Sequence, residues 1–116
     1  MKKVLIIDDD IGDQILTELA LKALGISCDR CCEQDGVEEK ISENDYSAIL
    51  VDYHMAPKDG GEMINDLKKI RPDLNMYIMT GYEREFVEKR VDCKHSGIIS
   101  KDGLIGNLRE FFYAPK

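Results

Sequence analysis

The sequence has no long apolar run. Only four apolar residues, 4–7, separate the opening Met-Lys-Lys from the first aspartate, which is too few for a signal peptide or a membrane span. We therefore expect a cytoplasmic protein that does not bind membranes. In a reducing cytosol its four cysteines are expected to be free thiols.

Positive charge is scarce, and two kinds of motif are missing. The chain has 16 Lys and Arg against 23 Asp and Glu, a formal charge of −7, which repels the phosphates of nucleic acids. It contains no Gly-x-x-x-x-Gly-Lys phosphate loop and no His or Cys pair spaced for zinc. Neither direct nucleic acid binding nor a nucleotide site is expected.

No linker or low-complexity stretch divides the 116 residues, and the three prolines are scattered. A chain of this length normally forms one domain with a real core. We expect residues 1–116 to form a single domain, which excludes a multidomain enzyme.

The chain instead alternates between strand-like and helix-like segments. Short apolar runs with little polar alternation are typical of strands buried on both faces. These runs lie at residues 4–7, 48–51, 76–79 and 97–99, with a weaker one at 27–32. Helical spacing of apolar residues follows each run, at 15–23, 63–70 and 104–112, and more weakly at 35–43 and 83–91. Five such pairs predict an α/β fold, a doubly wound parallel sheet with helices on both faces.

The first of these helices has a clear apolar face. Apolar residues recur there at helical spacing, namely Ile15, Leu16, Leu19, Ala20 and Ala23. We expect this face to pack on the sheet, because an amphipathic helix buries its apolar stripe.

Polar side chains stand where four of the predicted strands end. Asp8 and Asp9 follow the first strand, Asp52 follows the third, Thr80 the fourth and Lys101 the fifth. In such a sheet the carboxyl ends of the strands share one edge, so these side chains are expected to converge. Carboxylates gathered in a partly desolvated cleft need a cation, and an all-oxygen ligand set suits Mg²⁺.

Lys101 and Thr80 extend the acidic set toward phosphoryl chemistry. An ammonium group neutralises phosphate oxygens and a hydroxyl donates a hydrogen bond to one of them, as phosphoryl transfer requires. Asp52 is then the expected nucleophile.

At these residues the chain resembles the receiver domain of two-component response regulators, over essentially all of its length. Asp8 and Asp9 are similar to the acidic pair of that family, Asp52 to its phosphorylated aspartate, and Thr80 and Lys101 to its switch threonine and lysine. Any one of these motifs is weak, but the ordered set is specific.

The resemblance implies a flavodoxin-like (βα)5 fold with strand order 2-1-3-4-5, in which residues 52–60 resemble the family's Asp-x-x-Met-Pro-x-x-Asp-Gly loop and open the third helix. It implies Mg²⁺ held by Asp9, Asp52 and the backbone carbonyl of His54, with Asp8 acting mainly through water. Asp52 would accept a phosphoryl group from a sensor histidine kinase or a phosphotransfer protein. Such a domain is not a turnover enzyme.

The resemblance also implies how the domain meets its partners. A downstream protein target would dock on residues 83–91 and 98–112, and the domain would be a monomer or a weak dimer. Because the chain stops after the fifth helix, we expect a stand-alone receiver of the chemotaxis type, with a receiver excised from a longer regulator or hybrid kinase as the alternative.

Three positions depart from the family's pattern. Pro57 stands one place late, so the loop after the phosphorylation site is expected to differ in shape. Asp102 stands where many members have proline, so no cis peptide is expected before it. Ile98 replaces the usual aromatic switch residue, so the signal is expected to leave through the backbone of residues 80–82.

His54 and Tyr82, each two positions beyond a key residue, occupy places that tune hydrolysis in receivers. Two rings there would screen an acyl phosphate from water. We therefore expect a long-lived phosphoaspartate.

Three other functions stay open. Ile98 and the shifted Pro57 make a pseudo-receiver plausible, which is a domain that binds a partner without phosphorylation. Residues 8–10 give the Asp-x-Asp of haloacid dehalogenase-like phosphatases, whose first aspartate is the nucleophile, although the chain has no length for their cap domain. Cys28, Cys31 and Cys32 invite a zinc or redox site, although cysteine is often a small core residue.

Overall fold

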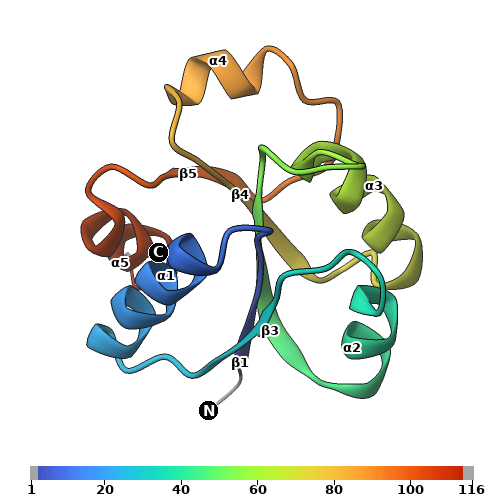
Figure 1. Cartoon of the computed structure of the whole chain (residues 1–116), viewed down its shortest axis with the longest axis horizontal. Helices are drawn as coiled ribbons and strands as arrows, with labels where there is room; N and C mark the ends of the chain where they lie inside the picture. The colour runs from blue at the N-terminus through green and yellow to red at the C-terminus, as the bar shows by residue number, and fades with distance from the viewer. Residues whose placement is uncertain (1–2, 114–116) are drawn as a thin grey trace.

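The computed structural model describes residues 3–113, which form five strands and five helices in strict alternation (Figure 1). The elements are β1 (Lys3–Ile7), α1 (Ile11–Ala23), β2 (Cys28–Cys31), α2 (Val37–Glu43), β3 (Tyr46–Asp52), α3 (Gly60–Ile70), β4 (Asn75–Thr80), α4 (Arg84–Glu88), β5 (Gly97–Ser100) and α5 (Leu104–Tyr113). The ends of the predicted domain, residues 1–2 and 114–116, lie outside the described residues. Every helix in the described part is too short or too polar to cross a bilayer.

The strands form one parallel sheet in the order β2-β1-β3-β4-β5, which confirms the predicted fold. The inner strands β1 and β3 are buried almost throughout, which explains why their sequences are apolar without alternation. The chain places β2 on one side of β1 and β3 on the other, so the crevice beyond the carboxyl ends of β1 and β3 is the expected position for a site.

The helices cover both faces of the sheet. Leu21 of α1 and Leu108 of α5 pack in one apolar cluster, whereas Ile41 of α2, Ile64 of α3 and Val87 of α4 pack in another. Figure 1 shows α1 and α5 together on one side of the sheet and α2 with α3 on the other. The sheet therefore has two cores.

The weaker elements are shorter than predicted. The second strand covers 28–31 within the predicted 27–32, and α4 covers 84–88 within the predicted 83–91. The second helix begins at Val37 rather than at 35, because Gly36 precedes it in a left-handed conformation with φ of 88°. Glycine adopts that conformation without steric cost.

The predicted packing face of α1 is confirmed at Ala20 but wrong at Ile15, Leu16 and Leu19. Ile15, Leu16 and Leu19 are 42%, 61% and 56% exposed, while Ala20 and Leu21 are buried. Most of the apolar stripe of this helix therefore faces solvent.

Two polar side chains lie on the buried face of α1 instead. Gln14 donates from Nε2 to the carbonyl oxygen of Asp8, and Thr17 donates from Oγ1 to the carbonyl oxygen of Asp13 at 3.0 Å. Both side chains are almost fully buried, and burial is tolerated because their hydrogen bonds are made. The bond from Gln14 ties α1 to the end of β1.

The start of α3 lies against the end of β3. Asp59 and Glu62 form a capping box, in which each side chain accepts from the other's backbone N–H. A Cβ atom at Gly60 would lie 2.7 Å from the carbonyl oxygen of Asp52, so only glycine permits this approach. Asp59 and Gly60 therefore open the third helix, as predicted.

Candidate functional site

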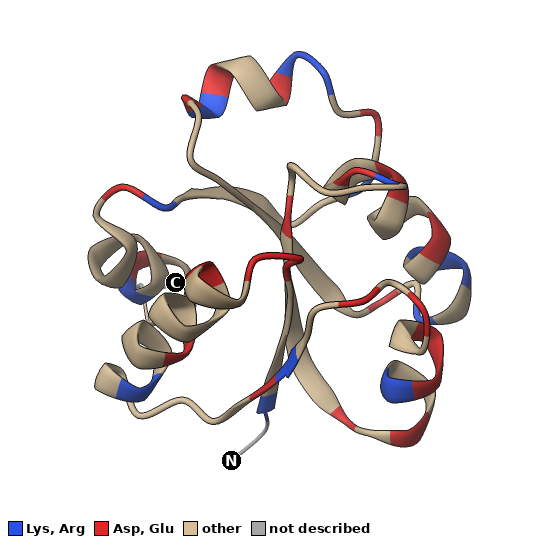
Figure 2. Ribbon diagram, in the orientation of Figure 1, with Lys and Arg blue, Asp and Glu red and all other residues tan. Residues whose placement is uncertain are grey.

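The carboxyl ends of β1, β3, β4 and β5 bring the predicted polar residues to one edge of the sheet. Asp8 and Asp9 follow β1, Asp52 and Thr80 end β3 and β4, and Lys101 follows β5. Figure 2 shows the acidic segment that follows β1 near the centre of the view, beside the end of β3. Residues far apart in the sequence thus form one site.

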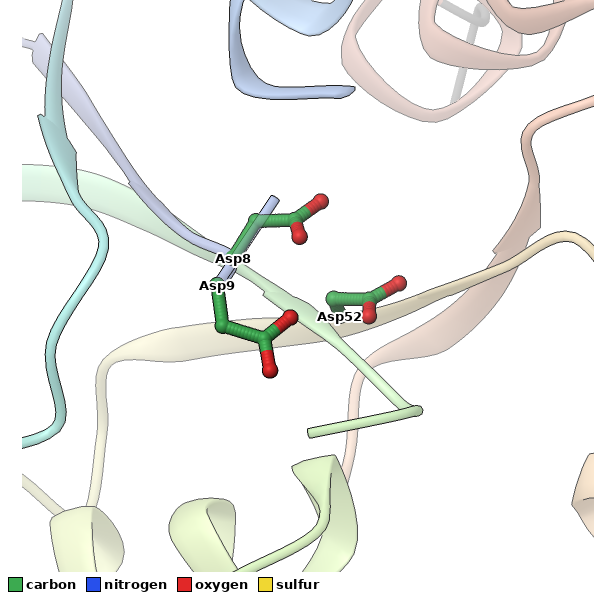
Figure 3. Close-up of side chains that lie close together, drawn as sticks. All are labelled: Asp8, Asp9 and Asp52. Carbon is green, nitrogen blue, oxygen red and sulfur yellow. The ribbon is translucent and has the colours of Figure 1, made fainter. Parts of the chain in front are cut away.

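Three carboxylates form the centre of this site (Figure 3). One oxygen from each of Asp8, Asp9 and Asp52 lies within 4.8 Å of the others. Asp8 and Asp52 are 0% and 6% exposed, whereas Asp9 is open to solvent. We call this group the acidic triad; its hard oxygen donors suit a divalent cation such as Mg²⁺.

The Lys101 ammonium lies among carboxylates. Its Nζ is 2.7 Å from Asp52 Oδ1, 2.9 Å from Asp13 Oδ2 and 3.2 Å from Asp8 Oδ2. The Lys101 side chain is 20% exposed, so water screens these contacts only in part. The Lys101 ammonium therefore neutralises part of the negative charge of the buried aspartates.

Burial still disfavours the ionised aspartates. Desolvation raises the pKa of Asp52 to about 6, because it outweighs the opposing contact with Lys101. Burial also raises the pKa of Asp8, against a backbone hydrogen bond from Asp10 and the charge of Lys101. Ionising both carboxylates therefore costs free energy that a bound cation would recover.

Lys101 responds in the opposite way. Burial alone would lower the pKa of its ammonium group, but hydrogen bonds to Asp52 and Asp13 raise it above the ordinary value. Lys101 is thus a permanent positive charge at this site.

Thr80 lies at the same edge, in the strand beside β3. It is 1% exposed, its Oγ1 accepts a hydrogen bond from the backbone N–H of Tyr82 at 2.9 Å, and its carbonyl oxygen accepts one from the Lys101 N–H at 2.8 Å. Thr80 therefore connects Lys101 with the segment that leads into α4.

A row of rings runs from the site to α4. The ring centroids of His54 and Tyr82 are 5.7 Å apart, those of Tyr82 and Phe86 are 5.2 Å apart, and the Arg90 guanidinium lies 3.6 Å from the Phe86 centroid. Such pairs stabilise each other through their quadrupoles and the nearby cation. We call these four residues the aromatic row.

The structure describes the three positions that depart from the family's pattern, which are Pro57, Ile98 and Asp102. Ile98 is 3% exposed within the core shared with α4. The bond before Asp102 is trans, and among the described residues the cis peptide is Ala56–Pro57, in the loop after β3.

Cys28 is a poor candidate for metal or redox chemistry. It is a free thiol whose Sγ donates to Glu18 at 3.6 Å. Burial, with the charge of Glu18, raises the pKa of Cys28 to about 11. The thiolate is the ligand and nucleophile, so this residue does not favour a zinc or redox site.

Sequence reasoning missed Asp13. It lies in the first turn of α1, three residues after the N-cap Asp10, and only the packed structure brings it to Lys101. The available signal was an acidic residue in the first turn of a helix that begins at the functional edge.

Comparisons with known proteins identify a family for this chain. The family model described as the response regulator receiver domain matches residues 4–112. The transcriptional regulatory protein ZraR of Klebsiella oxytoca is 29% identical over 98 residues, covering 83% of this chain and 21% of that protein. The chain thus spans about a fifth of that relative's length.

Solved structures share the fold. A CheY-like receiver domain protein from Methanospirillum hungatei has a TM-score of 0.80 at 23% identity, covering 96% of this chain and 90% of its own. The response regulator TrrA of Thermotoga maritima, solved with Mg²⁺ and BeF, has a TM-score of 0.81 at 20% identity and covers 96% of both chains. The same regulator, in complex with the histidine kinase ThkA, gives 0.81 at 21% identity, with 96% and 95% coverage.

Proposed function

The chain belongs to the family of response regulator receiver domains, and from this premise we propose that Asp52 is its phosphoacceptor, in a reaction that requires Mg²⁺. Members of this family are signalling domains of two-component systems, not turnover enzymes. The observation that carries the assignment is the position of Asp52, buried beside Asp8 with its Oδ1 2.7 Å from the Lys101 ammonium.

The acidic triad fits Mg²⁺. Asp9 and Asp52 would hold the ion directly, together with the carbonyl oxygen of His54, and Asp8 would act mainly through bound water. A bound divalent cation would neutralise carboxylate and phosphoryl charge. The raised pKa values of Asp8 and Asp52 support this fit, because burial disfavours their ionised forms and a bound cation would stabilise them.

The chain's own residues supply the rest of the chemistry. As an Oδ of Asp52 bonds to phosphorus, the bond from phosphorus to the donor nitrogen breaks. Lys101 would then redirect one of its N–H hydrogen bonds from Asp52 to a phosphoryl oxygen, and the Thr80 hydroxyl would donate a hydrogen bond to another phosphoryl oxygen. Donors already in place stabilise the developing charge without reorganisation.

The phosphoryl donor is proposed to be a sensor histidine kinase or a phosphotransfer protein. Its phosphohistidine must reach Asp52 across the edge of the sheet. The exposed side chains Leu16 and Leu19 of α1, with Ile105 of α5, line the same groove as Lys101 and offer an apolar surface at that entrance. The target is proposed to dock on residues 83–91 and 98–112.

The signal is proposed to leave through Thr80 and Tyr82. If the Thr80 hydroxyl turns toward a phosphoryl group, it releases the N–H of Tyr82, whose ring contacts Phe86 of α4 through the aromatic row. Ile98 is buried and carries no ring, so this route does not use a change of ring burial at that position.

The proposed function is tested by incubating the protein with Mg²⁺ and a small-molecule phosphodonor and measuring its intact mass. We expect the addition of one phosphoryl group, located on Asp52 by peptide mapping, and no addition when a chelator removes the metal. An unlabelled wild type would favour the pseudo-receiver. Phosphate ester turnover that depends on Asp8 would favour the phosphatase.

The aromatic row predicts the lifetime of the label. Tyr82→Ala, which opens one side of the His54 ring, is expected to shorten the half-life of the phosphoaspartate about threefold, because water gains access to the acyl phosphate. The half-life is measured by intact mass after removal of the donor. Tyr77→Ala, which removes a ring packed on α5, is the control variant. Loss of the wild-type label within seconds would contradict the prediction of a long-lived phosphoaspartate.

A further inference from the structure

Asp13 contacts the site without belonging to the acidic triad. Its Oδ2 lies 2.9 Å from Lys101 Nζ. An ammonium group has three N–H donors, and carboxylates from the end of β1, the first turn of α1 and the end of β3 surround this one. Asp13 therefore takes the third contact of Lys101.

The backbone of Asp13 is fixed on both sides. Its N–H donates to Asp10 Oδ1 at 3.1 Å, and its carbonyl oxygen accepts from the Thr17 hydroxyl at 3.0 Å. Its side chain is 42% exposed, unlike the buried carboxylates of Asp8 and Asp52. The backbone of Asp13 is thus held in place, and its carboxylate contacts the ammonium group from the solvent side.

We propose that Asp13 is a positioning residue for phosphoryl transfer, which keeps the Lys101 ammonium beside Asp52 Oδ1 where an incoming phosphoryl oxygen arrives. This inference rests on the proposed function of Asp52. A lysine side chain has many rotamers, and restricting them before the reaction removes an entropic cost from the transfer step. Asp13 acts through Lys101 and does not touch the phosphoryl group.

Three variants separate the effect of holding Lys101 in position from the effect of the negative charge of Asp13. Asp13→Ala and Asp13→Asn remove the same charge, but asparagine keeps an oxygen that can accept from Lys101. Asp10→Asn removes a carboxylate at the same end of α1 and keeps the helix cap, because asparagine caps as well as aspartate does.

The rate test uses Mg²⁺ with a saturating small-molecule phosphodonor. Asp13→Ala is expected to lower the labelling rate constant about tenfold and Asp13→Asn about threefold, with Asp10→Asn at the wild-type rate. Circular dichroism and thermal unfolding verify that each variant folds. An Asp13→Ala rate at or above wild type overturns the proposal, as do equal rates for the two Asp13 variants.

A second measurement needs no phosphodonor. The side-chain ammonium signal of Lys101 in a ¹H–¹⁵N NMR spectrum, assigned by its absence in Lys101→Met, reports how firmly the group is held. It is expected in the wild type and in Asp10→Asn and is expected to disappear in Asp13→Ala through fast exchange with water. A wild type that takes no label overturns the proposed function and this role together. If the wild type is labelled normally but the Lys101 ammonium signal is unchanged in Asp13→Ala, only the role of Asp13 is overturned.

Discussion

Asp52→Asn is expected to abolish phosphoryl uptake and, in metal-free buffer at pH 7.5, to raise the free energy of unfolding by about 3 kcal/mol. The first effect follows because an amide is not the carboxylate nucleophile. The second follows because Asp52 is ionised at this pH although burial raises its pKa to about 6, so its charge opposes folding.

The pH dependence of this second effect has a definite sign. The pKa of Asp52 is raised from 3.8, so between these values the folded protein binds more protons at this residue than the unfolded chain does. The contribution of Asp52 is therefore most favourable below the unfolded pKa and is lost as the pH rises through the folded pKa. The advantage of Asp52→Asn should vanish near pH 4.

Urea unfolding of the metal-free proteins at pH 4 and pH 7.5 measures this difference. Asp45→Asn, which removes an exposed carboxylate just before β3, should match the wild type at both values within about 0.5 kcal/mol. Equal stability of Asp52→Asn and wild type at pH 7.5 would show that the site is not short of positive charge. Mg²⁺ should stabilise the wild type more than the variant, because Asp52 belongs to the proposed metal site of the folded state.

Lys101→Met is expected to destabilise the metal-free protein by about 3 kcal/mol and to slow phosphorylation of Asp52 about 100-fold. Methionine keeps the length of the side chain but leaves the buried carboxylates of Asp8 and Asp52 without their shared counter-ion. The transfer step would also lose the ammonium group that is proposed to neutralise a phosphoryl oxygen.

Unfolding in urea with and without Mg²⁺, together with labelling by the phosphodonor, measures both effects. Added Mg²⁺ should restore more stability to Lys101→Met than to the wild type, because the metal then carries the whole charge compensation. Lys58→Met is the matched control, since Lys58 pairs with Asp66 at the surface and such pairs contribute little. If Lys101→Met were as stable and as reactive as Lys58→Met, the role given to the ammonium group would be wrong.

The sequence by itself determined the fold and most of the site. Strands buried on both faces leave apolar runs that need no tertiary information to recognise, and parallel strands bring their carboxyl ends to one edge. Asp8, Asp52 and Lys101 could therefore be placed together from their positions after such runs. The family resemblance rested on the same residues.

Only the tertiary structure decided which side of α1 is buried and what else reaches Lys101. Hydrophobic periodicity placed Leu16 on the sheet, yet Gln14 lies there because the carbonyl oxygen of Asp8 accepts its hydrogen bond. Asp13 joins Lys101 because α1 starts at the end of β1 and packs beside α5. A sequence pattern records the polarity of each residue, whereas these two outcomes depend on partners supplied by other elements once they have packed.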